Sequence, residues 1–405
     1  MPPGTGASIC SRSIATRTGP QPRDQGLPGV GRPEEARIRI GLDGTPLLGR
    51  PTGVGRYVSG LLGALVATTG DAARDDVRVT AFTLRGGRGL AAVVPAGAAA
   101  RPRPAPARLL RLVWSRSELV PVTLLAGRSD VFHGTNFTLP PTGRAGGVVT
   151  VHDLAYLHHP DTVARSSAAY RELVPRSIAR AAQVVVPSAA VAAELRETYR
   201  LAEDRVTVTP LGVDEAWSRA TPPGPGDRRR LGLPEDYLVA VGTIEPRKGL
   251  PGLLTAYRAL LSVRPQAPPL VLVGPEGWGA ALELDPFPAG AVRFTGYLAD
   301  DDLRGTVAGA RALVFPSRYE GFGLPPLEAL ACGVPVIASD LPVTREVLGG
   351  AARLTGSAEE LVDALVEAVD GTLPGDPGSR RSHASAWTWE RCAERTRTAY
   401  RRALS

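Results

Sequence analysis

The segment that limits the fold of this chain most strongly lies in its last quarter. There, an apolar run is followed by a glycine-rich loop and then by a helix that begins with two prolines. Residues Ala312–Phe315 are continuously apolar, which is typical of a buried strand. Pro325 and Pro326 suit the first turn of a helix, where no backbone N–H is missed, and Gly333 suits its C-terminal cap. The order strand, loop, helix places free N–H groups and the positive end of a helix dipole where a phosphate is stabilised.

Two carboxylates, Glu320 and Glu328, flank this predicted anion site. A carboxylate is repelled by a bound phosphate, so each should face another group. Sugar hydroxyls are suitable partners, because a carboxylate accepts two hydrogen bonds from a vicinal diol. A loop that holds a phosphate and two sugars describes a nucleotide-sugar site. The spacing leaves equally open that Glu320 is a solvated loop residue and Glu328 a surface helix residue.

The segment Glu-Gly-Phe-Gly-Leu-Pro-Pro-Leu-Glu, residues 320–328, resembles the signature of glycosyltransferase family 4. Residues 331–339 continue the resemblance, which extends over roughly 37–403. It implies an α/β protein of the GT-B type, with two Rossmann-like doubly wound domains facing a central cleft. It also implies a retaining, metal-independent hexosyltransferase. The nucleotide-diphosphate sugar is then a co-substrate, so no cofactor is expected, and the second substrate is a hydroxyl acceptor.

The resemblance assigns catalytic roles to four side chains, His152, Glu320, Arg247 and Lys248. Arg247 and Lys248 would hold the diphosphate, since Arg binds phosphate bidentately and Lys as a point charge. Glu320 would position the donor sugar and Glu328 the ribose diol. The residues expected to bind the nucleotide sugar are Gly53, Gly55, Gly242, Gly274, Tyr297, Gly321, Phe322, Gly323, Leu324 and Glu328.

Two histidines follow predicted strands. His152 lies at the carboxyl end of a strand, where ligand sites of open α/β sheets form, and Asp153 beside it could fix its tautomer or hold a second hydroxyl. The resemblance makes His152 an active-site residue that contacts the sugar or the acceptor. A satisfied histidine at a strand end is the alternative. His133, at another strand end, is interpreted as lining the acceptor side.

Strand and helix patterns alternate along both halves, which predicts parallel sheets covered on both faces. The strands expected in the first half are 37–42, 77–84, 130–133, 148–151, 184–186 and 206–208. Those expected in the second half are 237–241, 270–273, 292–295, 312–315 and 334–338. Helices are expected at 54–66, 166–180, 188–199, from 250, at 303–310 and from 387.

A length of 405 residues favours two domains. Residues 1–36 hold six glycines and six prolines without an apolar period, which predicts a disordered tail. The expected domains are 37–220, on the acceptor side, and 234–385, which binds the nucleotide sugar. A proline-rich linker at 221–233 separates them. A final helix at 386–405 is expected to cross back to the first domain.

The formal net charge is +7, but no nucleic-acid recognition motif is present, so no nucleic-acid partner is expected. Residues 101–128 carry six arginines among apolar residues, a pattern compatible with peripheral membrane contact or with a solvated helix. Three scattered cysteines and no apolar stretch of spanning length indicate a cytoplasmic protein, with the inner membrane face as an optional surface.

The motifs around Asp43, His152 and Arg247 look most like mannosyltransferases that use GDP-mannose, while UDP- and dTDP-sugars stay open. Residues 300–302, three aspartates, are interpreted as a helix cap and first turn, with no metal site. Three other activities remain: a nucleotide-sugar 2-epimerase, a glycosidase that uses two carboxylates, or a non-catalytic sugar-binding subunit.

Overall fold

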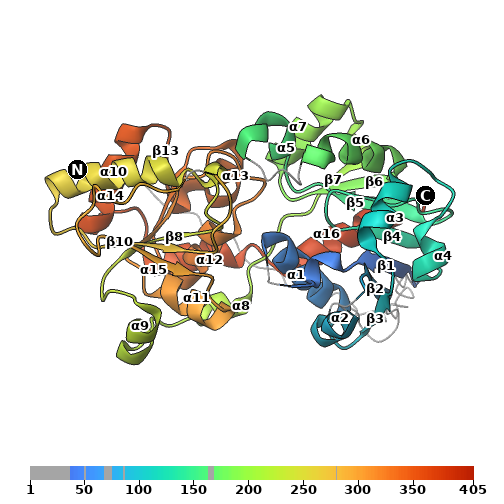
Figure 1. The fold of residues 1–405 in the computed structure, drawn as a ribbon, viewed down its shortest axis with the longest axis horizontal. Coiled ribbons are helices and arrows are strands. Elements are labelled where there is room, and N and C mark those ends of the chain that lie inside the picture. The colour runs from blue at the N-terminus through green and yellow to red at the C-terminus, as the bar shows by residue number, and fades with distance from the viewer. Residues whose placement is uncertain (1–36, 50–51, 68–74, 85–86, 163–167, 280) are drawn as a thin grey trace, which may run out of the picture. The chain divides into compact units, whose positions relative to one another are not determined.

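Seven parallel strands build the first sheet, in the order β3-β2-β1-β4-β5-β6-β7 (Figure 1). The computed structural model describes residues 37–49, 52–67, 75–84, 87–162, 168–279 and 281–405. The strands are β1 (Arg39–Asp43), β2 (Asp76–Phe82), β3 (Ala98–Arg103), β4 (Val131–Gly134), β5 (Gly146–Thr150), β6 (Gln183–Val186) and β7 (Val206–Val208). The strand order reverses at β1, which pairs with β2 and β4, so ligand chemistry is expected beside its carboxyl end.

This sheet and the helices that connect its strands form the first lobe, and the second sheet with its helices, described below, forms the second lobe. The helices of the first lobe are α1 (Gly53–Ala67), α2 (Gly87–Val93), α3 (Ala107–Trp114), α4 (Val122–Ala126), α5 (Ala155–His158), α6 (Tyr170–Arg180) and α7 (Ala189–Tyr199). Helix α1 buries Leu61 and Leu65 in the same apolar core as Ile40 and Val79 of the sheet. Ser188 caps α7 by accepting a hydrogen bond from the Val191 N–H, a role that serine often takes before a helix.

Six parallel strands build the second sheet, in the order β10-β9-β8-β11-β12-β13. The strands are β8 (Leu238–Val241), β9 (Leu270–Val273), β10 (Val292–Gly296), β11 (Ala312–Phe315), β12 (Val336–Ser339) and β13 (Arg353–Thr355). The helices are α8 (Glu215–Ser218), α9 (Pro225–Leu231), α10 (Leu250–Val263), α11 (Asp300–Ala308), α12 (Leu324–Cys332), α13 (Pro342–Leu348), α14 (Ala358–Asp370) and α15 (Pro377–Ser385).

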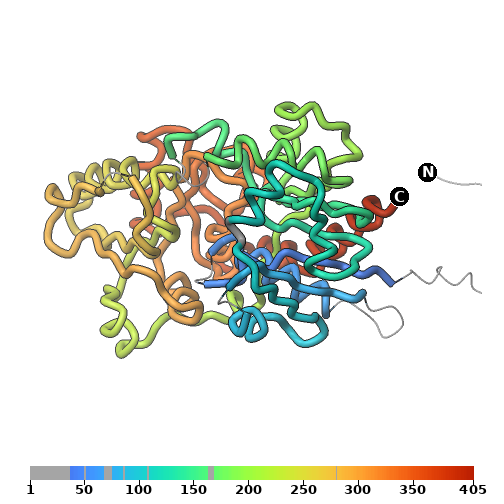
Figure 2. Tube along the Cα trace, turned by 45° about the vertical axis from the view of Figure 1, so that its right-hand side comes forward, coloured from blue at the N-terminus to red at the C-terminus, as the bar shows by residue number. Residues whose placement is uncertain are grey.

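The last helix, α16 (Trp389–Arg402), packs against α1 of the first lobe. Trp389 lies over Gly60, where an added Cβ would come within 2.2 Å of the indole ring. Arg397 donates to the Asp75 carboxylate and to the carbonyl of Leu65. Figure 2 shows this red C-terminal segment running beside the blue N-terminal segments. The chain therefore passes between the lobes twice, once near 209–237 and once before α16.

The prediction of two parallel, Rossmann-like sheets is confirmed. Strands β3 and β13 were not predicted: β3 is an edge strand of alanine and arginine, and β13 has only three residues, too few for a periodicity. The linker is not simply turns, because it contains α9. Helix α16 begins at Trp389 instead of residue 387. In α11 the N-cap position is occupied by Ala299, which makes no side-chain cap hydrogen bond, so the three aspartates form only the first turn of that helix. The predicted disordered tail lies outside the described residues.

His133 does not line an acceptor surface, so that prediction is wrong. The ring is buried, with Nδ1 2.8 Å from the Tyr400 hydroxyl and Nε2 2.7 Å from Thr150 Oγ1. Thr150 Oγ1 also lies 2.8 Å from the Tyr57 hydroxyl. Burial lowers the pKa of His133 to about 3, so the ring is neutral. Its two hydrogen bonds connect Tyr400 of α16 to Thr150 of the sheet.

Replacing Tyr400 by phenylalanine is expected to lower the free energy of unfolding by about 1–3 kcal/mol, because Nδ1 of buried His133 loses its partner. Urea unfolding would measure the change. Thr398→Ala, on the exposed side of the same helix, is the control and should shift stability by less than about 0.5 kcal/mol. An unchanged unfolding midpoint for Tyr400→Phe would show that this hydrogen bond does not hold α16 in place.

Candidate functional site

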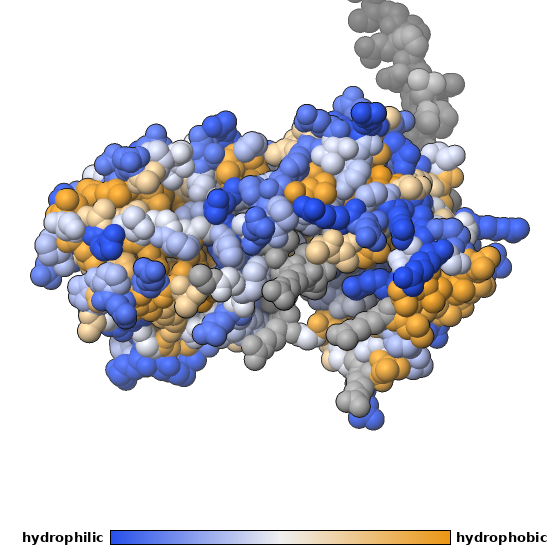
Figure 3. Space-filling view, turned by 45° about the horizontal axis from the view of Figure 1, so that its top comes forward, coloured by the Kyte–Doolittle hydropathy of each residue, from blue (hydrophilic) through white to orange (hydrophobic). Residues whose placement is uncertain are grey.

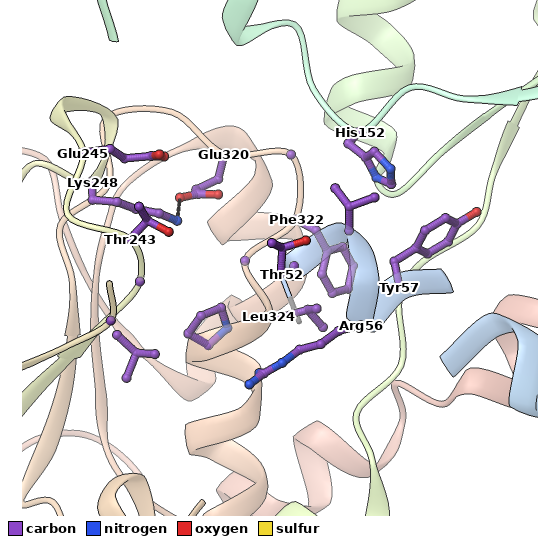
Figure 4. A pocket seen from close by; sticks show the side chains of 18 of the residues that line it. Thr52, Arg56, Tyr57, His152, Thr243, Glu245, Lys248, Glu320, Phe322 and Leu324 are labelled. Atoms are coloured by element: carbon purple, nitrogen blue, oxygen red, sulfur yellow. Dashed lines mark hydrogen bonds and ion pairs between the residues drawn. The ribbon is translucent and has the colours of Figure 1, made fainter. Parts of the chain in front are cut away.

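A cavity of about 450 Å³ is lined by residues that follow β5 and β6 of the first lobe and β8, β9 and β11 of the second. Of the predicted site residues it contains His152, Arg247, Lys248, Glu320, Gly53, Gly242, Gly274, Tyr297, Gly321, Phe322, Gly323 and Leu324. Gly55 and Glu328 line an adjoining cavity of about 470 Å³ instead. Figure 4 shows Lys248 and Glu320 on one side of the first cavity and His152 and Tyr57 on the other, with Phe322 between them.

The glycine-rich loop enters α12 as its sequence predicts. Gly323 is the residue before the helix and has φ of 94°, a left-handed conformation that disfavours side chains. Pro325 and Pro326 occupy the first turn, and Gly333, with φ of 82°, ends the helix. The start of α12 faces the cavity, and because Pro325 and Pro326 have no N–H, the donors to an anion there are the backbone N–H groups of Leu324 and of the loop before it.

Arg247 and Lys248 end a short 3-10 turn, Pro246–Lys248, and both reach Glu320. Lys248 Nζ lies 2.7 Å from Glu320 Oε1, and Arg247 Nη1 lies 3.3 Å from Oε2. Arg247 also pairs with Glu245 at 2.9 Å, and its Nη1 lies 3.7 Å from Asp153 of the first lobe. The Arg318 N–H donates to the Arg247 carbonyl, which fixes this turn to the glycine-rich loop.

Glu320 is ionised despite its burial. Burial raises the pKa of a carboxyl, but the charges of Lys248 and Arg247 and the hydrogen bond from Lys248 outweigh it, so the pKa of Glu320 is lowered. Burial acts against the charge of Arg247 as well, but Glu320, Asp153 and Glu245 raise its pKa. Glu320 and Arg247 are therefore both charged at neutral pH, and Glu320 can only accept hydrogen bonds.

His152 is held by contacts of its own lobe. Its Nε2 lies 2.9 Å from the Thr135 carbonyl, which can only accept, so Nε2 carries the proton and Nδ1 is left as an acceptor. Tyr57 and Phe137 pack edge-on against the ring, with centroids 5.1 and 5.4 Å away. Burial lowers the pKa of His152, so the ring is neutral.

Asp153 does not fix the tautomer of His152, contrary to the prediction. Its carboxylate accepts from the Ala155 N–H and faces Arg247. The group that does so is a backbone carbonyl, that of Thr135, and a carbonyl leaves no signal in the sequence.

The two lobes meet closely around Gly321. A Cβ at this glycine would lie 1.9 Å from the carbonyl oxygen of His152. Ser188 Oγ donates to the Gly321 carbonyl at 2.9 Å, and the Tyr319 hydroxyl donates to Glu194 at 2.7 Å. The Glu346 carboxylate accepts from the first two N–H groups of α7, at 2.8 and 3.0 Å. Glu346, which the sequence left without a role, thus caps a helix of the other lobe.

A third cavity, of about 160 Å³, lies within the first lobe. Its lining includes the carboxylate of Asp43, the arginines Arg111 and Arg176, and the rings of Trp114 and Tyr170. Tyr170 stacks on Phe137, which packs against His152 of the first cavity. The Phe137 ring therefore connects Tyr170 of this cavity to His152 of the first cavity.

Arg56 is the main residue whose contacts sequence reasoning missed. It lies between Gly55 and Tyr57 in α1 and forms an ion pair with Glu328 of the second lobe, at 2.8 Å. An arginine next to a glycine-rich helix start is a usable signal, but its partner is 272 residues away and depends on how the lobes meet.

Neither a metal site nor a membrane span emerges from the part of the chain that the structure describes. No group of three or more His, Cys, Asp or Glu side chains in these residues could hold a metal ion. No helix among them combines the length and apolar character needed to cross a bilayer.

Comparison with known proteins gives consistent matches over both lobes. The profile described as "Glycosyltransferase Family 4" matches residues 51–217, and "Glycosyl transferases group 1" matches 235–371. The O-antigen chain mannosyltransferase B of Escherichia coli is 31% identical over 284 residues, covering 67% of this chain and 74% of that protein. The serotype-specific mannosyltransferase WbdA of the same species is 33% identical over 192 residues, 44% of this chain but 24% of that longer protein.

Solved structures share the fold at low identity. A sucrose-phosphate synthase from Thermosynechococcus elongatus superimposes with a TM-score of 0.66 at 21% identity, covering 90% of this chain and 98% of that one.

Proposed function

This chain belongs to glycosyltransferase family 4, and we propose that it is a retaining hexosyltransferase whose favoured donor is GDP-mannose and whose acceptor is a hydroxyl. Glycosyl transfer as such follows from the family. The preference for mannose is supported by relatives that are named as mannosyltransferases and are 31% and 33% identical over 284 and 192 residues.

The observation that carries the proposal is the double pairing of Glu320 with Lys248 and Arg247 beside the start of α12. The Glu320 carboxylate offsets part of the positive charge of Lys248 and Arg247. A nucleotide-diphosphate sugar can satisfy both sides of this cluster: its phosphates take over Lys248 and Arg247, while its sugar hydroxyls donate to Glu320. A free phosphate or a free sugar would satisfy only one side, so the site fits the conjugate best.

The reaction needs a stabilised leaving group more than a strong nucleophile. The bond between the anomeric carbon and the phosphate oxygen breaks, and the acceptor oxygen forms its bond on the same face of the sugar. The proton of the acceptor hydroxyl passes to the departing phosphate oxygen. Arg247, Lys248 and the backbone N–H groups of residues 321–324 stabilise the negative charge that develops on the diphosphate, without a metal ion.

His152 orients the donor sugar in this proposal. Its neutral ring offers Nδ1 as an acceptor, and the edge-on packing of Tyr57 and Phe137 keeps that nitrogen in place. A neutral histidine also avoids placing a proton donor beside the positive charge that builds on the anomeric carbon. His152 therefore fits the role of a hydrogen-bond acceptor for a sugar hydroxyl better than that of an acid.

The third cavity is the proposed acceptor site. Its Tyr170 stacks on Phe137, which packs against His152, so an acceptor held there lies near the histidine and the donor sugar. Trp114 and Tyr170 offer aromatic faces for a sugar ring, and Asp43 and Arg111 offer hydrogen bonds of both kinds.

Peripheral membrane contact beside this cavity is part of the proposal, with the inner membrane face as the surface. Leu109, Leu112, Leu119 and Leu124, on and around α3 and α4, are all exposed, with 47–88% of their surface accessible. In Figure 3 apolar patches lie among hydrophilic side chains on the right-hand half, the side on which α3 and α4 lie in Figure 1. Exposed leucines among arginines suit an anionic lipid surface.

A donor panel tests the proposal. GDP-mannose should raise the thermal unfolding temperature more than UDP-glucose, UDP-galactose or dTDP-glucose, and adding a hydroxyl acceptor should accelerate GDP release. Mannosyl transfer with retained α-configuration, read by NMR of the product, would support the retaining mechanism. A donor that is converted without an acceptor would indicate an epimerase. Binding with no turnover for any acceptor would indicate a sugar-binding subunit, and cleavage of a plain glycoside would indicate a glycosidase.

A further inference from the structure

Arg56 extends from α1 of the first lobe to a carboxylate of the second. Its Nη1 lies 2.8 Å from Glu328 Oε1, and its Nη2 lies 3.4 Å from Asp300 Oδ1. The Glu328 side chain is only 5% exposed, so this pair is largely removed from water. Arg56 lines both the donor cavity and the adjoining cavity that contains Glu328, and Leu324 lines both as well. Arg56 therefore stands at the junction of the two cavities.

The other charges around Glu328 come from several elements, and most repel a carboxylate. Asp300 of α11 and Asp214, on the segment before α8, both disfavour its ionised form. Glu390 of α16 and Arg304 of α11 line the same cavity. On its own helix the neighbour is Cys332, a buried thiol. Arg56 is thus the cation that contacts Glu328 within the described residues, and it faces several carboxylates.

One oxygen of Glu328 stays available. Arg56 bonds to Oε1, while Oε2 makes no hydrogen bond to any residue in the described part of the chain. An ionised carboxylate with one free oxygen can still accept hydrogen bonds from a diol. If Arg56 blocked the carboxylate, both oxygens would be engaged, as in a bidentate arginine–carboxylate pair. The geometry therefore fits Arg56 as a counter-ion of Glu328 better than as a residue that blocks its carboxylate.

We propose that Arg56 is the counter-ion, supplied by the first lobe, that keeps Glu328 ionised so that it can accept the ribose hydroxyls of the donor nucleotide. This inference rests on the proposed function, which places the ribose at Glu328. Its consequence is that the nucleotide site of the second lobe is incomplete until the first lobe contributes Arg56. Arg56 acts through Glu328 and is a positioning residue.

The direction of the pH effect follows from the surroundings of Glu328. Burial raises the pKa of Glu328 to about 7, and the charge and hydrogen bond of Arg56 oppose that rise. Without Arg56 the pKa of Glu328 should rise further, and the carboxyl would be protonated at neutral pH. A protonated carboxyl loses acceptor capacity, so nucleotide affinity should fall at neutral pH and recover as the pH rises through the new pKa.

Isothermal titration calorimetry between pH 6.5 and 9 tests this inference. GDP, UDP and dTDP are titrated first, and the nucleotide that binds the wild type most tightly is then used for every variant and pH. For the wild type, affinity should weaken as the pH falls through about 7. For Arg56→Ala a shift of about one pKa unit should weaken binding by about threefold at pH 7.5 and by about eightfold at pH 6.5, and should leave it almost equal to the wild type at pH 9. Arg56→Lys, which keeps the charge, should stay close to the wild type.

Two further comparisons separate this role from a structural one. A 2′-deoxy form of the same nucleotide should lose less affinity than the ribose form on Arg56→Ala, because it makes fewer hydrogen bonds to Glu328. Glu328→Gln should abolish the pH step in both the presence and the absence of Arg56, and so tests the inference even if Arg56→Ala folds poorly. Arg264→Ala, which removes a surface ion pair with Asp370, is the matched control and should bind like the wild type.

The outcomes are distinct. Equal weakening of ribose and deoxyribose nucleotides at every pH would overturn the inference, and so would tighter binding by Arg56→Ala, which would make Arg56 a competitor of the ribose. Either result leaves the proposed function standing. If the wild type binds none of the nucleotides, the proposed function itself fails, and this inference fails with it.

Discussion

Replacing Arg247 by alanine should lower the rate of glycosyl transfer by about a hundredfold or more, since removing one preorganised donor to a developing oxyanion typically costs that much. The guanidinium lines the first cavity beside Lys248 and the start of α12. In the proposed function its charge stabilises the departing diphosphate, so the loss should appear mainly in kcat. Initial rates of nucleotide release, measured over a range of donor concentrations, would separate kcat from KM.

Stability has to be followed in the same experiment. Arg247 is 19% exposed at its side chain and is surrounded by Glu245, Asp153 and Glu320, so its removal leaves carboxylates facing one another. Breaking a buried ion pair on one side commonly costs about 3–5 kcal/mol, and partial exposure should reduce that figure here. Arg247→Lys keeps a charge but loses bidentate binding, so it should fold well and still be slow. Near-wild-type turnover by the alanine variant would contradict a diphosphate site at this position.

Much of the fold was accessible from local patterns. Strands such as Ala312–Phe315 and Leu270–Val273 are short apolar runs followed directly by proline or glycine, and such runs are buried on both faces of a parallel sheet. The glycine-rich loop before α12 and its two prolines carry their conformation in their own chemistry. Strand β3 could not be found in this way, because its alanines and arginines pair only at the edge of the sheet.

In the candidate site, the contacts within one lobe could be predicted from the sequence, and those between the lobes could not. The groups gathered by one lobe, Arg247, Lys248 and Glu320, were predictable because each follows a strand of the same sheet, and the carboxyl ends of parallel strands meet at one edge. The partners of Arg56 and Glu346 lie in the opposite lobe, and no periodicity encodes how two lobes meet. His133 and His152 are both at strand ends in the sequence, but only burial by α16 decides that His133 is structural.

Replacing Gly321 by alanine should reduce transfer by about a hundredfold while leaving both lobes folded. The added Cβ would lie 1.9 Å from the His152 carbonyl oxygen and 3.2 Å from Asp153 Cβ, and both of these belong to the other lobe. The nearest atom is backbone and cannot rotate away, so the lobes must separate. A displacement of about 1 Å between reacting groups is enough to cost about a hundredfold in rate.

The matched control is Gly252→Ala in α10, where an added Cβ meets nothing within 4 Å. It should transfer like the wild type, and its helix should gain slightly in stability, because alanine is favoured over glycine inside helices. For Gly321→Ala, small-angle X-ray scattering should show a larger radius of gyration, and the unfolding midpoint should change little. If Gly321→Ala transfers at the wild-type rate, the close approach of His152 to the glycine-rich loop is not the catalytic arrangement. In that case the donor sugar must be held by the second lobe alone. Reduced transfer with an unchanged radius would instead place the damage within the loop, because the backbone of α12 would then have moved in preference to the lobes.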